Sequence, residues 1–149
     1  MEYYVEKVED LYSLDLERLV QESEKEGYRF VARLVNEIKD ESNLFNRPGE
    51  GLFCVKNDAG SIIAIGGINQ SPFDTTSGVG RLRRFYVAED ARREGVGTLL
   101  LQSIVEHAKK HFTEITVRTD SSKADAFYRA CGFTFDDSAS ETTHFLILQ

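Results

Sequence analysis

The chain has 149 residues, a length that predicts one domain spanning 1–149. Hydrophobic residues make up 41% and charged residues 29%, which argues against intrinsic disorder. The formal net charge of −7 argues against nucleic-acid binding, because that requires a basic surface to displace counterions from phosphates. No apolar run approaches the roughly 20 residues of a membrane span, and the first residues lack the apolar region of a signal peptide. Two cysteines cannot form a disulfide framework, although one bridge is possible, and we therefore expect a reduced, cytoplasmic compartment. We also expect a monomer or homodimer that interacts with neither nucleic acid nor membrane.

The first half of the chain has the pattern of a strand, two helices and a hairpin. Apolar side chains recur at helical spacing in two stretches, and two later β-branched runs flank the turn-forming residues 57–61. The expected elements are a strand at Tyr3–Val8, helices at Leu11–Glu24 and Tyr28–Lys39, a loop at Asn43–Glu50, and antiparallel strands at Leu52–Lys56 and Ile62–Ile68.

The second half alternates between strands and helices. A loop is expected at Gln70–Gly80, where Pro72 and two glycines occur. Ser122 is predicted to cap a short helix, with Asp125 completing a capping box and Gly132 ending the helix. The other expected elements are a strand at Arg81–Ala88, a helix at Val96–His111, and strands at Glu114–Thr119, Phe133–Phe135 and His144–Leu148. This order predicts an α+β fold with a mixed, largely antiparallel sheet and helices on both faces.

A basic cluster and a glycine turn lie between one predicted strand and the long helix. The arginines are Arg81, Arg83, Arg84, Arg92 and Arg93, and in an acidic chain they indicate either a local anion site or a solvated run of charge. The turn Glu94-Gly95-Val96-Gly97-Thr98 leads into a helix N-terminus, whose free N–H groups attract anions. It is not a P-loop, which has a lysine after its last glycine, nor a dinucleotide fingerprint, which has three glycines.

Two motifs in this half resemble those of a known family. Arg92-Arg93-Glu94-Gly95-Val96-Gly97 matches the pattern Arg/Gln-x-x-Gly-x-Gly/Ala, and the segment Ala126–Phe133 is similar to the ending A-x-x-F-Y-x-x-x-G-F. With these motifs and the order of its elements, the chain resembles the GNAT superfamily of acyl-CoA-dependent N-acetyltransferases. The resemblance implies a GNAT-like fold, with a sheet of about seven strands and a splayed gap between strands 4 and 5.

The resemblance also implies acetyl-CoA as the cosubstrate and an amine as the acceptor. In such folds the glycine turn holds the pyrophosphate through backbone N–H groups, and the fourth strand pairs with the pantetheine arm, where a backbone N–H polarises the thioester carbonyl. The residues that this implies for cofactor binding are Phe85, Tyr86, Val87, Arg92, Arg93, Glu94, Gly95, Val96, Gly97, Thr98 and Ser122.

Tyr128 corresponds to the tyrosine that returns a proton to the departing thiolate in the family, which makes it the candidate general acid. The alternative is a half-buried aromatic residue on a short helix, with Phe127 facing the core. Some relatives carry a glutamate base on the fourth strand, but Arg81 occupies that position here. The base is therefore water or one of four other residues, namely Glu50, Asp120, Glu141 and His144.

Several polar residues remain as candidates with competing interpretations. Arg81 and Arg83 are candidates for binding a substrate carboxylate, and the alternative is a salt bridge with acidic neighbours. An acidic surface instead favours cationic amines, so the acceptor stays open. His107 and His111 have a spacing that can bind metal, but we expect no metal, and we expect Cys131 to pack in the core. The alternative function is that of a non-catalytic acyl-CoA-binding sensor or interaction protein on the same fold.

Overall fold

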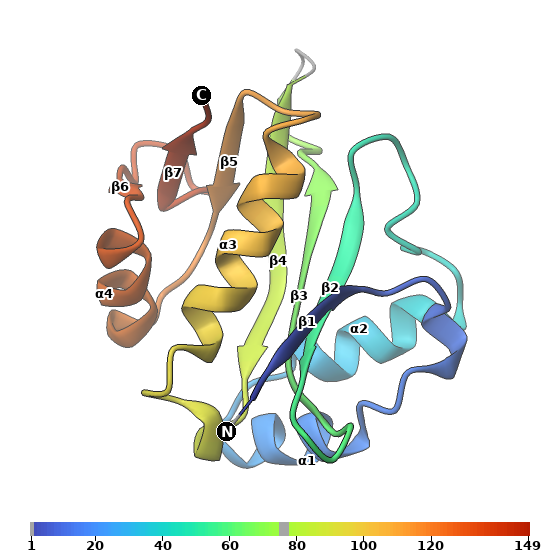
Figure 1. Cartoon of the computed structure of the whole chain (residues 1–149). Coiled ribbons are helices and arrows are strands. Elements are labelled where there is room, and N and C mark those ends of the chain that lie inside the picture. The colour runs from blue at the N-terminus through green and yellow to red at the C-terminus, as the bar shows by residue number, and fades with distance from the viewer. Residues whose placement is uncertain (1, 75–77) are drawn as a thin grey trace.

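Apolar, β-branched runs form the centre of one seven-stranded sheet in the computed structural model, which describes residues 2–74 and 78–149 (Figure 1). The predicted loop at 70–80 therefore includes three residues, 75–77, that lie outside the described residues. The elements are β1 (Tyr4–Lys7), η1 (Leu11–Ser13), α1 (Glu17–Lys25), α2 (Phe30–Lys39), β2 (Gly51–Lys56), β3 (Ile62–Gln70), β4 (Val79–Val87), η2 (Glu89–Ala91), α3 (Val96–Ala108), β5 (Glu114–Val117), α4 (Ser122–Ala130), β6 (Thr134–Phe135) and β7 (His144–Ile147).

The strands lie in the order β1-β2-β3-β4-β5-β7-β6. Every neighbouring pair is antiparallel except β4 and β5, which are parallel and are connected through α3. The predicted α+β class and the mixed, largely antiparallel sheet are therefore confirmed.

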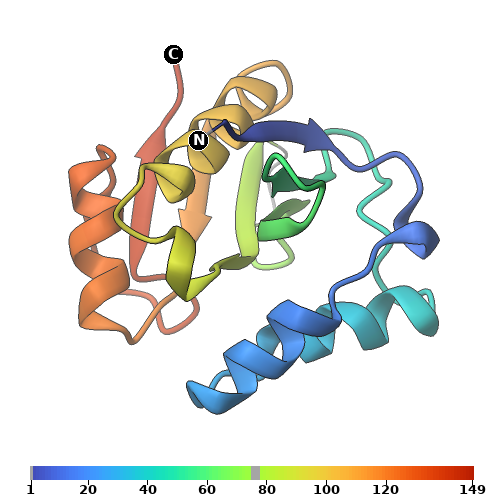
Figure 2. The same cartoon turned by 60° about the horizontal axis from the view of Figure 1, so that its bottom comes forward.

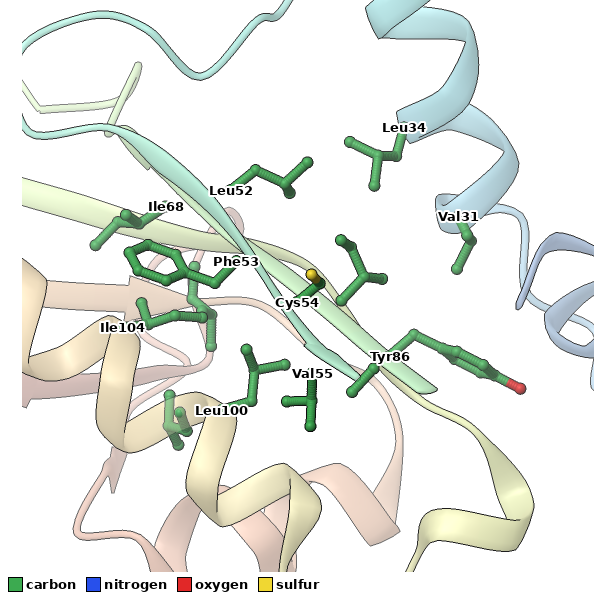
Figure 3. Close-up of a cluster of buried hydrophobic side chains, with 14 of the residues drawn as sticks. Val31, Leu34, Leu52, Phe53, Cys54, Val55, Ile68, Tyr86, Leu100 and Ile104 are labelled. Atoms are coloured by element: carbon green, nitrogen blue, oxygen red, sulfur yellow. The ribbon is translucent and has the colours of Figure 1, made fainter. Parts of the chain in front are cut away.

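Helices cover both faces of the sheet, as predicted (Figure 2). α1 and α2 lie on one face, and α3 lies on the other, where it contacts β1 to β4. Alternate residues of β2 serve the two layers, since Leu52 points toward α2 whereas Phe53 and Val55 point toward α3 (Figure 3). Each such buried side chain stabilises the fold by about 1.5–3 kcal/mol, so the two layers hold the central strands from both sides.

The first predicted helix, Leu11–Glu24, is wrong as one element, because it divides into η1 and α1. Asp10 accepts a hydrogen bond from the Tyr12 N–H, and Asp15 accepts one from the Glu17 N–H. Such short-range bonds satisfy backbone donors outside a helix, so they compete with a continuous one. α3 likewise ends at Ala108, before the predicted end at His111, because the chain tightens there into bonds such as His111 N–H to the Ala108 carbonyl.

The cap of α4 is Ser121, not the predicted Ser122. The Ser121 hydroxyl accepts a hydrogen bond from the Ala124 N–H at 3.2 Å, and Ser122 is the first helical residue. Asp125 completes no capping box, because its carboxylate contacts Arg129 and His144 instead. Gly132 follows the helix with a φ of 96°, in agreement with the predicted stop.

No helix within residues 2–74 and 78–149 is long and apolar enough to cross a membrane.

Candidate active site

β4 and β5 are paired over only part of their length. The paired residues are Val79 with Glu114, Gly80 with Ile115 and Arg81 with Thr116. β4 then continues to Val87 beside β3 alone, while β5 turns away and pairs along its whole length with β7. Figure 1 shows the two strands diverging toward α4 and the start of α3. The predicted splayed gap is therefore present, and it leaves one edge of the second half of β4 without a neighbouring strand.

The glycine turn lies at the open end of this gap. Gly95 precedes α3 with a φ of 80°, Arg93 has a φ of 69°, and no side chain of the described residues caps this end of the helix. The helix hydrogen bonds begin with Leu99 N–H to the Gly95 carbonyl at 2.9 Å. The preceding N–H groups therefore point out of the helix end, where the macrodipole also favours an anion.

The two glycines of the turn differ in their surroundings. A Cβ at Gly95 would meet no atom within 4 Å, so its backbone is open to a ligand. A Cβ at Gly97 would lie 3.4 Å from the Phe127 ring and 3.5 Å from Val87, so Gly97 is packed at the floor of the gap. Free N–H groups, an open glycine and a helix N-terminus together fit a phosphate-bearing cosubstrate.

Arg92 does not point freely into the turn. Its guanidinium forms two hydrogen bonds with the Glu26 carboxylate, at 2.6 and 2.8 Å, and its Nε donates to the Val87 carbonyl at 3.0 Å. These bonds raise the pKa of Arg92 and hold the pKa of Glu26 at about 2. Arg92 thus joins the end of α1 to the end of β4. The other arginine of the turn, Arg93, forms no ion pair within the described residues.

A β-bulge lies in the middle of β4. Ile65 pairs with Tyr86 and Gly67 pairs with Arg83, so Gly66 alone faces the two residues Arg84 and Phe85. Arg84 has a φ of 60°, and its guanidinium binds Glu37 of α2 through bonds of 3.0 and 3.1 Å. The sequence did not reveal this bulge, because arginine rarely adopts positive φ and no local pattern marks it.

The bulge places Phe85 on the face of α3 and α4. A Cβ at Gly66 would lie 2.8 Å from the Phe85 ring, so a side chain at Gly66 would displace that ring. Phe85 packs against Phe127 and Tyr128, with ring centroids 5.7 and 6.3 Å apart. The part of β4 implicated in cosubstrate binding is thereby in contact with the helix that carries the candidate acid. Tyr86 points the other way, and its hydroxyl donates to Glu22 and Glu26.

Tyr128 is the buried aromatic residue of α4, with 5% of its surface exposed, whereas Phe127 is half-buried. The alternative interpretation, a half-buried Tyr128 beside a core-facing Phe127, therefore does not describe the structure, because Tyr128 is the more buried of the two. Burial raises the pKa of Tyr128, and the nearby Cys131 thiol raises it further. The hydroxyl consequently stays protonated at neutral pH, the state that a general acid requires.

Cys131 lies between Tyr128 and the turn. Burial raises the pKa of its thiol, and a hydrogen bond with Thr98 opposes that change. Thr98 of α3 and Cys131 after α4 are therefore in contact. Because both cysteines are free thiols, a disulfide plays no part in this arrangement.

Of the four candidate bases, His144 is the one in contact with Tyr128. It is 1% exposed, and its ring centroid lies 5.8 Å from that of Tyr128. Its Nε2 is 2.7 Å from Asp125 Oδ1 and its Nδ1 is 2.8 Å from the Thr143 hydroxyl. Both ring nitrogens are therefore engaged, which fits an orienting role better than proton exchange with an acceptor.

The other three candidate bases are acidic residues on loops. Glu50 is buried and accepts hydrogen bonds from the N–H groups of Gln70 and Arg47, so it fastens the loop before β2 to β3. Asp120 is exposed and forms an ion pair with Arg118. Glu141 accepts a weak hydrogen bond from the Ser140 hydroxyl at 3.4 Å. Within the described part of the chain, none of the three forms a hydrogen bond with Tyr128 or with the glycine turn.

Arg81 and Arg83 project from β4 on the face covered by α1 and α2. Neither forms an ion pair within the part of the chain that the structure describes, so the salt-bridge interpretation is not supported there. The Arg81 guanidinium lies over the Phe73 ring, 4.9 Å from its centroid. Burial lowers the pKa of both arginines, and each is lowered further by a neighbouring arginine.

The histidine pair on α3 has structural contacts. His107 Nε2 lies 3.0 Å from the Gly49 carbonyl oxygen, and its ring packs against Phe53 and His111. Burial lowers the pKa of His107. Within residues 2–74 and 78–149 no three His, Cys, Asp or Glu side chains gather in a metal-binding arrangement.

Comparison with known proteins identifies one family and several structures with the same fold. The model of the acetyltransferase (GNAT) family matches residues 7–133. No curated protein matches the chain. Among solved structures, a proposed acetyltransferase from Exiguobacterium sp. 255-15 is 28% identical, with a TM-score of 0.88 over 99% of this chain and 94% of that one.

More distant structures share the fold. A GNAT-family acetyltransferase from Staphylococcus aureus Mu50 is 16% identical, with a TM-score of 0.78 over 99% of this chain and all of that one. Glucosamine-6-phosphate N-acetyltransferase from Arabidopsis thaliana is 14% identical, with a TM-score of 0.66 over 93% of this chain and 96% of that one. These similarities extend along nearly the full length of each chain.

Proposed function

The chain belongs to the GNAT acetyltransferase family, and we infer from this that it transfers an acetyl group from acetyl-CoA to a primary amine. The observation that carries the proposal is the gap between β4 and β5, which opens onto the uncapped N-terminus of α3. An extended thioester cosubstrate needs both features, because its pyrophosphate takes backbone N–H donors and its arm takes the unpaired edge of a strand. When bound, acetyl-CoA supplies the activated acetyl group that the amine attacks.

Binding of the cosubstrate is assigned to the turn and the adjoining strand. Backbone N–H groups of Arg93, Gly95, Val96, Gly97 and Thr98 hold the pyrophosphate. Arg92 acts indirectly, by fixing the turn to Glu26 and Val87. The backbone of Phe85 to Val87 offers its free edge to the arm, and Ser122, the first residue of α4, is also assigned to cosubstrate binding.

Proton transfer is assigned to Tyr128. Its hydroxyl is held protonated by burial, and its ring is fixed by Phe85, Phe127, Phe133 and His144. A donor fixed in this way can return a proton to the thiolate that leaves as the amine attacks. The amine itself is deprotonated by water, since β4 bears no carboxylate between Val79 and Val87.

We assign this activity to a single catalytic domain that works in the cytoplasm. Cys54 and Cys131 are free thiols, which is typical of proteins from a reducing compartment. Burial and the nearby Glu6 raise the pKa of Cys54 to about 11, so its thiol stays protonated.

Titration calorimetry with acetyl-CoA tests the proposal, on the parent protein and on two Gly97 variants. Gly97→Ala adds a methyl group that fits at ordinary contact distance, whereas Gly97→Trp fills the gap between the turn and α4. We expect tight binding by the parent, a small loss with alanine, and at least about a tenfold loss with tryptophan. Unchanged affinity in a folded Gly97→Trp variant would place the cosubstrate elsewhere. Release of free thiol upon addition of amines then separates an enzyme from a sensor that only binds acetyl-CoA.

A further inference from the structure

Within residues 2–74 and 78–149, two half-buried guanidinium groups on β4, those of Arg81 and Arg83, have no anionic partner. Arg81 Nη1 is fully buried and has no hydrogen-bond partner among the described residues. Arg81 and Arg83 also form no ion pair there, whereas Arg84 between Arg83 and Phe85 is paired with Glu37. A buried polar group without a partner is rare in folded proteins, and a buried charge is rarer still, so such a pair calls for an explanation.

Both guanidinium groups lie on the face of the sheet that α1 and α2 cover. Arg81 and Arg83 alternate with Gly80 and Leu82, and a Cβ at Gly80 would meet Phe112 on the face of α3. The arginines therefore point to the opposite face, which α1 and α2 cover. Arg83 immediately precedes the bulge, and Arg81 lies about 7 Å farther along the strand. The acyl donor is assigned to the free edge of β4 after the bulge, so a molecule on this face would lie next to it.

The acidic groups near these arginines are engaged by other donors. Glu37 binds Arg84, and the Glu50 carboxylate accepts two backbone N–H groups. Asp74 accepts a hydrogen bond from Ser71 at 2.6 Å, and Glu141 accepts one from Ser140.

A third cation adds to the positive charge. Arg118 is close enough to lower the pKa of Arg81, although its own guanidinium is bound to Asp120 and to the Ser140 carbonyl. The pKa of Arg81 is lowered by burial and then by Arg83, and that of Arg83 by burial and then by Arg84, and the nearby carboxylates do not offset these effects. The site therefore has positive charge that no described residue neutralises directly.

The aromatic ring of Phe73 orients one of the two groups. It lies against the Arg81 guanidinium, and 53% of its own surface is exposed. Stacking of this kind covers one face of a guanidinium but does not occupy its N–H groups, which lie in the plane of the group and keep their hydrogen-bonding capacity. Those N–H groups form a fork whose geometry matches the two oxygens of a carboxylate or phosphate.

We propose that Arg81 and Arg83 bind an anionic group, a carboxylate or a phosphate, carried by the amine acceptor. The proposal rests on the acetyl transfer proposed above, because it assigns the acceptor to this face of β4. The acceptor is thus a zwitterionic or amino-phosphate compound, and a simple alkylamine or polyamine is excluded as the preferred substrate.

Matched pairs of amines test this assignment. One pair is an α-amino acid and its amide, and the other is a hexosamine 6-phosphate and the parent hexosamine, so each pair differs by one anionic group. Thiol release gives kcat/KM for every compound, and calorimetry gives the affinity of each for the complex of protein and CoA. The protein is used in its parent form and as Arg81→Gln, Arg83→Gln and Arg33→Gln, the last of which removes an exposed arginine of α2 as the charge control.

We expect the anionic member of one pair to exceed its neutral partner by at least about tenfold, since a site built for a charged group rejects the analogue that lacks it. Arg81→Gln and Arg83→Gln should abolish most of that advantage, and Arg33→Gln should keep it. The pair that shows the advantage distinguishes carboxylate from phosphate.

Three results would overturn the anion site. The first is equal kcat/KM for both members of both pairs, and the second is an advantage of the anionic member that survives in Arg81→Gln and Arg83→Gln. The third is that neither anionic compound binds to the complex of protein and CoA. Acetyl-CoA affinity is measured separately on each variant and should not change. A parent protein that fails to bind acetyl-CoA would instead overturn the proposed function, whereas anion binding that depends on Arg81 would remain measurable by calorimetry.

Discussion

The Glu26 carboxylate and the Arg92 guanidinium face each other with both oxygens bonded, at 2.6 and 2.8 Å, although the residues are 66 positions apart. Glu26 follows α1 and also accepts a hydrogen bond from the Tyr86 hydroxyl. One carboxylate therefore connects the end of α1, the end of β4 and the turn before α3. The position of the turn depends on this contact as well as on its own glycines.

Replacing Glu26 with glutamine should destabilise the protein by about 1 kcal/mol at pH 7, after allowance for solvent screening of a partly exposed pair. The pKa of Glu26 is lowered from 4.5 to about 2, chiefly by Arg92. Its stabilising effect is therefore complete above pH 4.5 and is lost as the pH falls from 4.5 to 2. Urea unfolding of the parent and of Glu26→Gln should differ equally at pH 7 and 5.5, and the difference should shrink below pH 4.5. Glu24→Gln, which alters an exposed residue of α1, serves as the control and should show no such dependence.

Tyr128→Phe should reduce turnover without disturbing the fold. The variant keeps the ring that packs against Phe85, Phe133 and His144 but removes the hydroxyl. Loss of a general acid typically lowers a rate by about 10²-fold or more, so kcat should fall by that amount while acetyl-CoA affinity and melting temperature stay close to those of the parent. A phenylalanine variant with parental kcat would assign Tyr128 to packing alone.

The pH profile should report the acceptor's own ionisation. With no carboxylate on β4, a free amine must arise by deprotonation in water, and an alkylamine has a pKa near 10.4. For such an amine, kcat/KM should rise with a slope near one between about pH 6.5 and 9. Tyr128 should not interrupt the rise, because burial moves its pKa above the ordinary value.

A plateau near pH 7 with an amine of high pKa would contradict the role of water and require a protein base. Single substitutions of Glu50, Asp120, Glu141 and His144 would then identify that base. Because an α-amine has a pKa near 8 and levels off earlier, the pKa of each acceptor is measured alongside.

Asp125→Asn should destabilise the region around Tyr128 rather than change the chemistry. Hydrogen bonds from Arg129 and then His144 lower the pKa of Asp125, so its stabilising effect is present above the ordinary pKa and is lost as the pH falls through the lowered value. At pH 7 the variant should have a lower melting temperature than the parent, and the two should converge in strong acid. The slope of the pH–rate profile should stay the same. A changed slope would instead indicate that the contact between Asp125 and His144 takes part in proton transfer.

The sequence predicted the helices and turns that form through interactions between residues close together in the chain. The apolar periods of α2 and α3, the hairpin turn at 57–61 and the glycine turn before α3 all appear in the structure. The division of the first helix was missed, because the bonds of Asp10 and Asp15 to the nearby backbone override an apolar period that continues through them. Ser121 and Ser122 are equivalent in a sequence pattern, and only the geometry of the chain decides which of them caps α4.

The features of the site that the sequence did not predict depend on contacts between residues far apart in the chain. Arg92 was assigned to the anion site by its motif, but its guanidinium is bound by Glu26, which no pattern near Arg92 indicates. The bulge at Arg84 depends on Glu37 of α2 and on the room that Gly66 leaves for Phe85. Whether Arg81 and Arg83 have acidic partners likewise depends on residues brought together by the fold, so the sequence left both interpretations open.

The bulge also has a consequence for how the protein can evolve. By adding one residue to β4, it places Phe85 on the face of α3 and Arg83 on the face of α1 and α2, within three consecutive positions. Under the proposed assignment of Arg81 and Arg83 to the acceptor, point substitutions on one face of β4 can therefore change the acceptor while Phe85 keeps its contacts on the other face. Such a change needs no insertion or deletion in β4, because the bulge already separates the two faces.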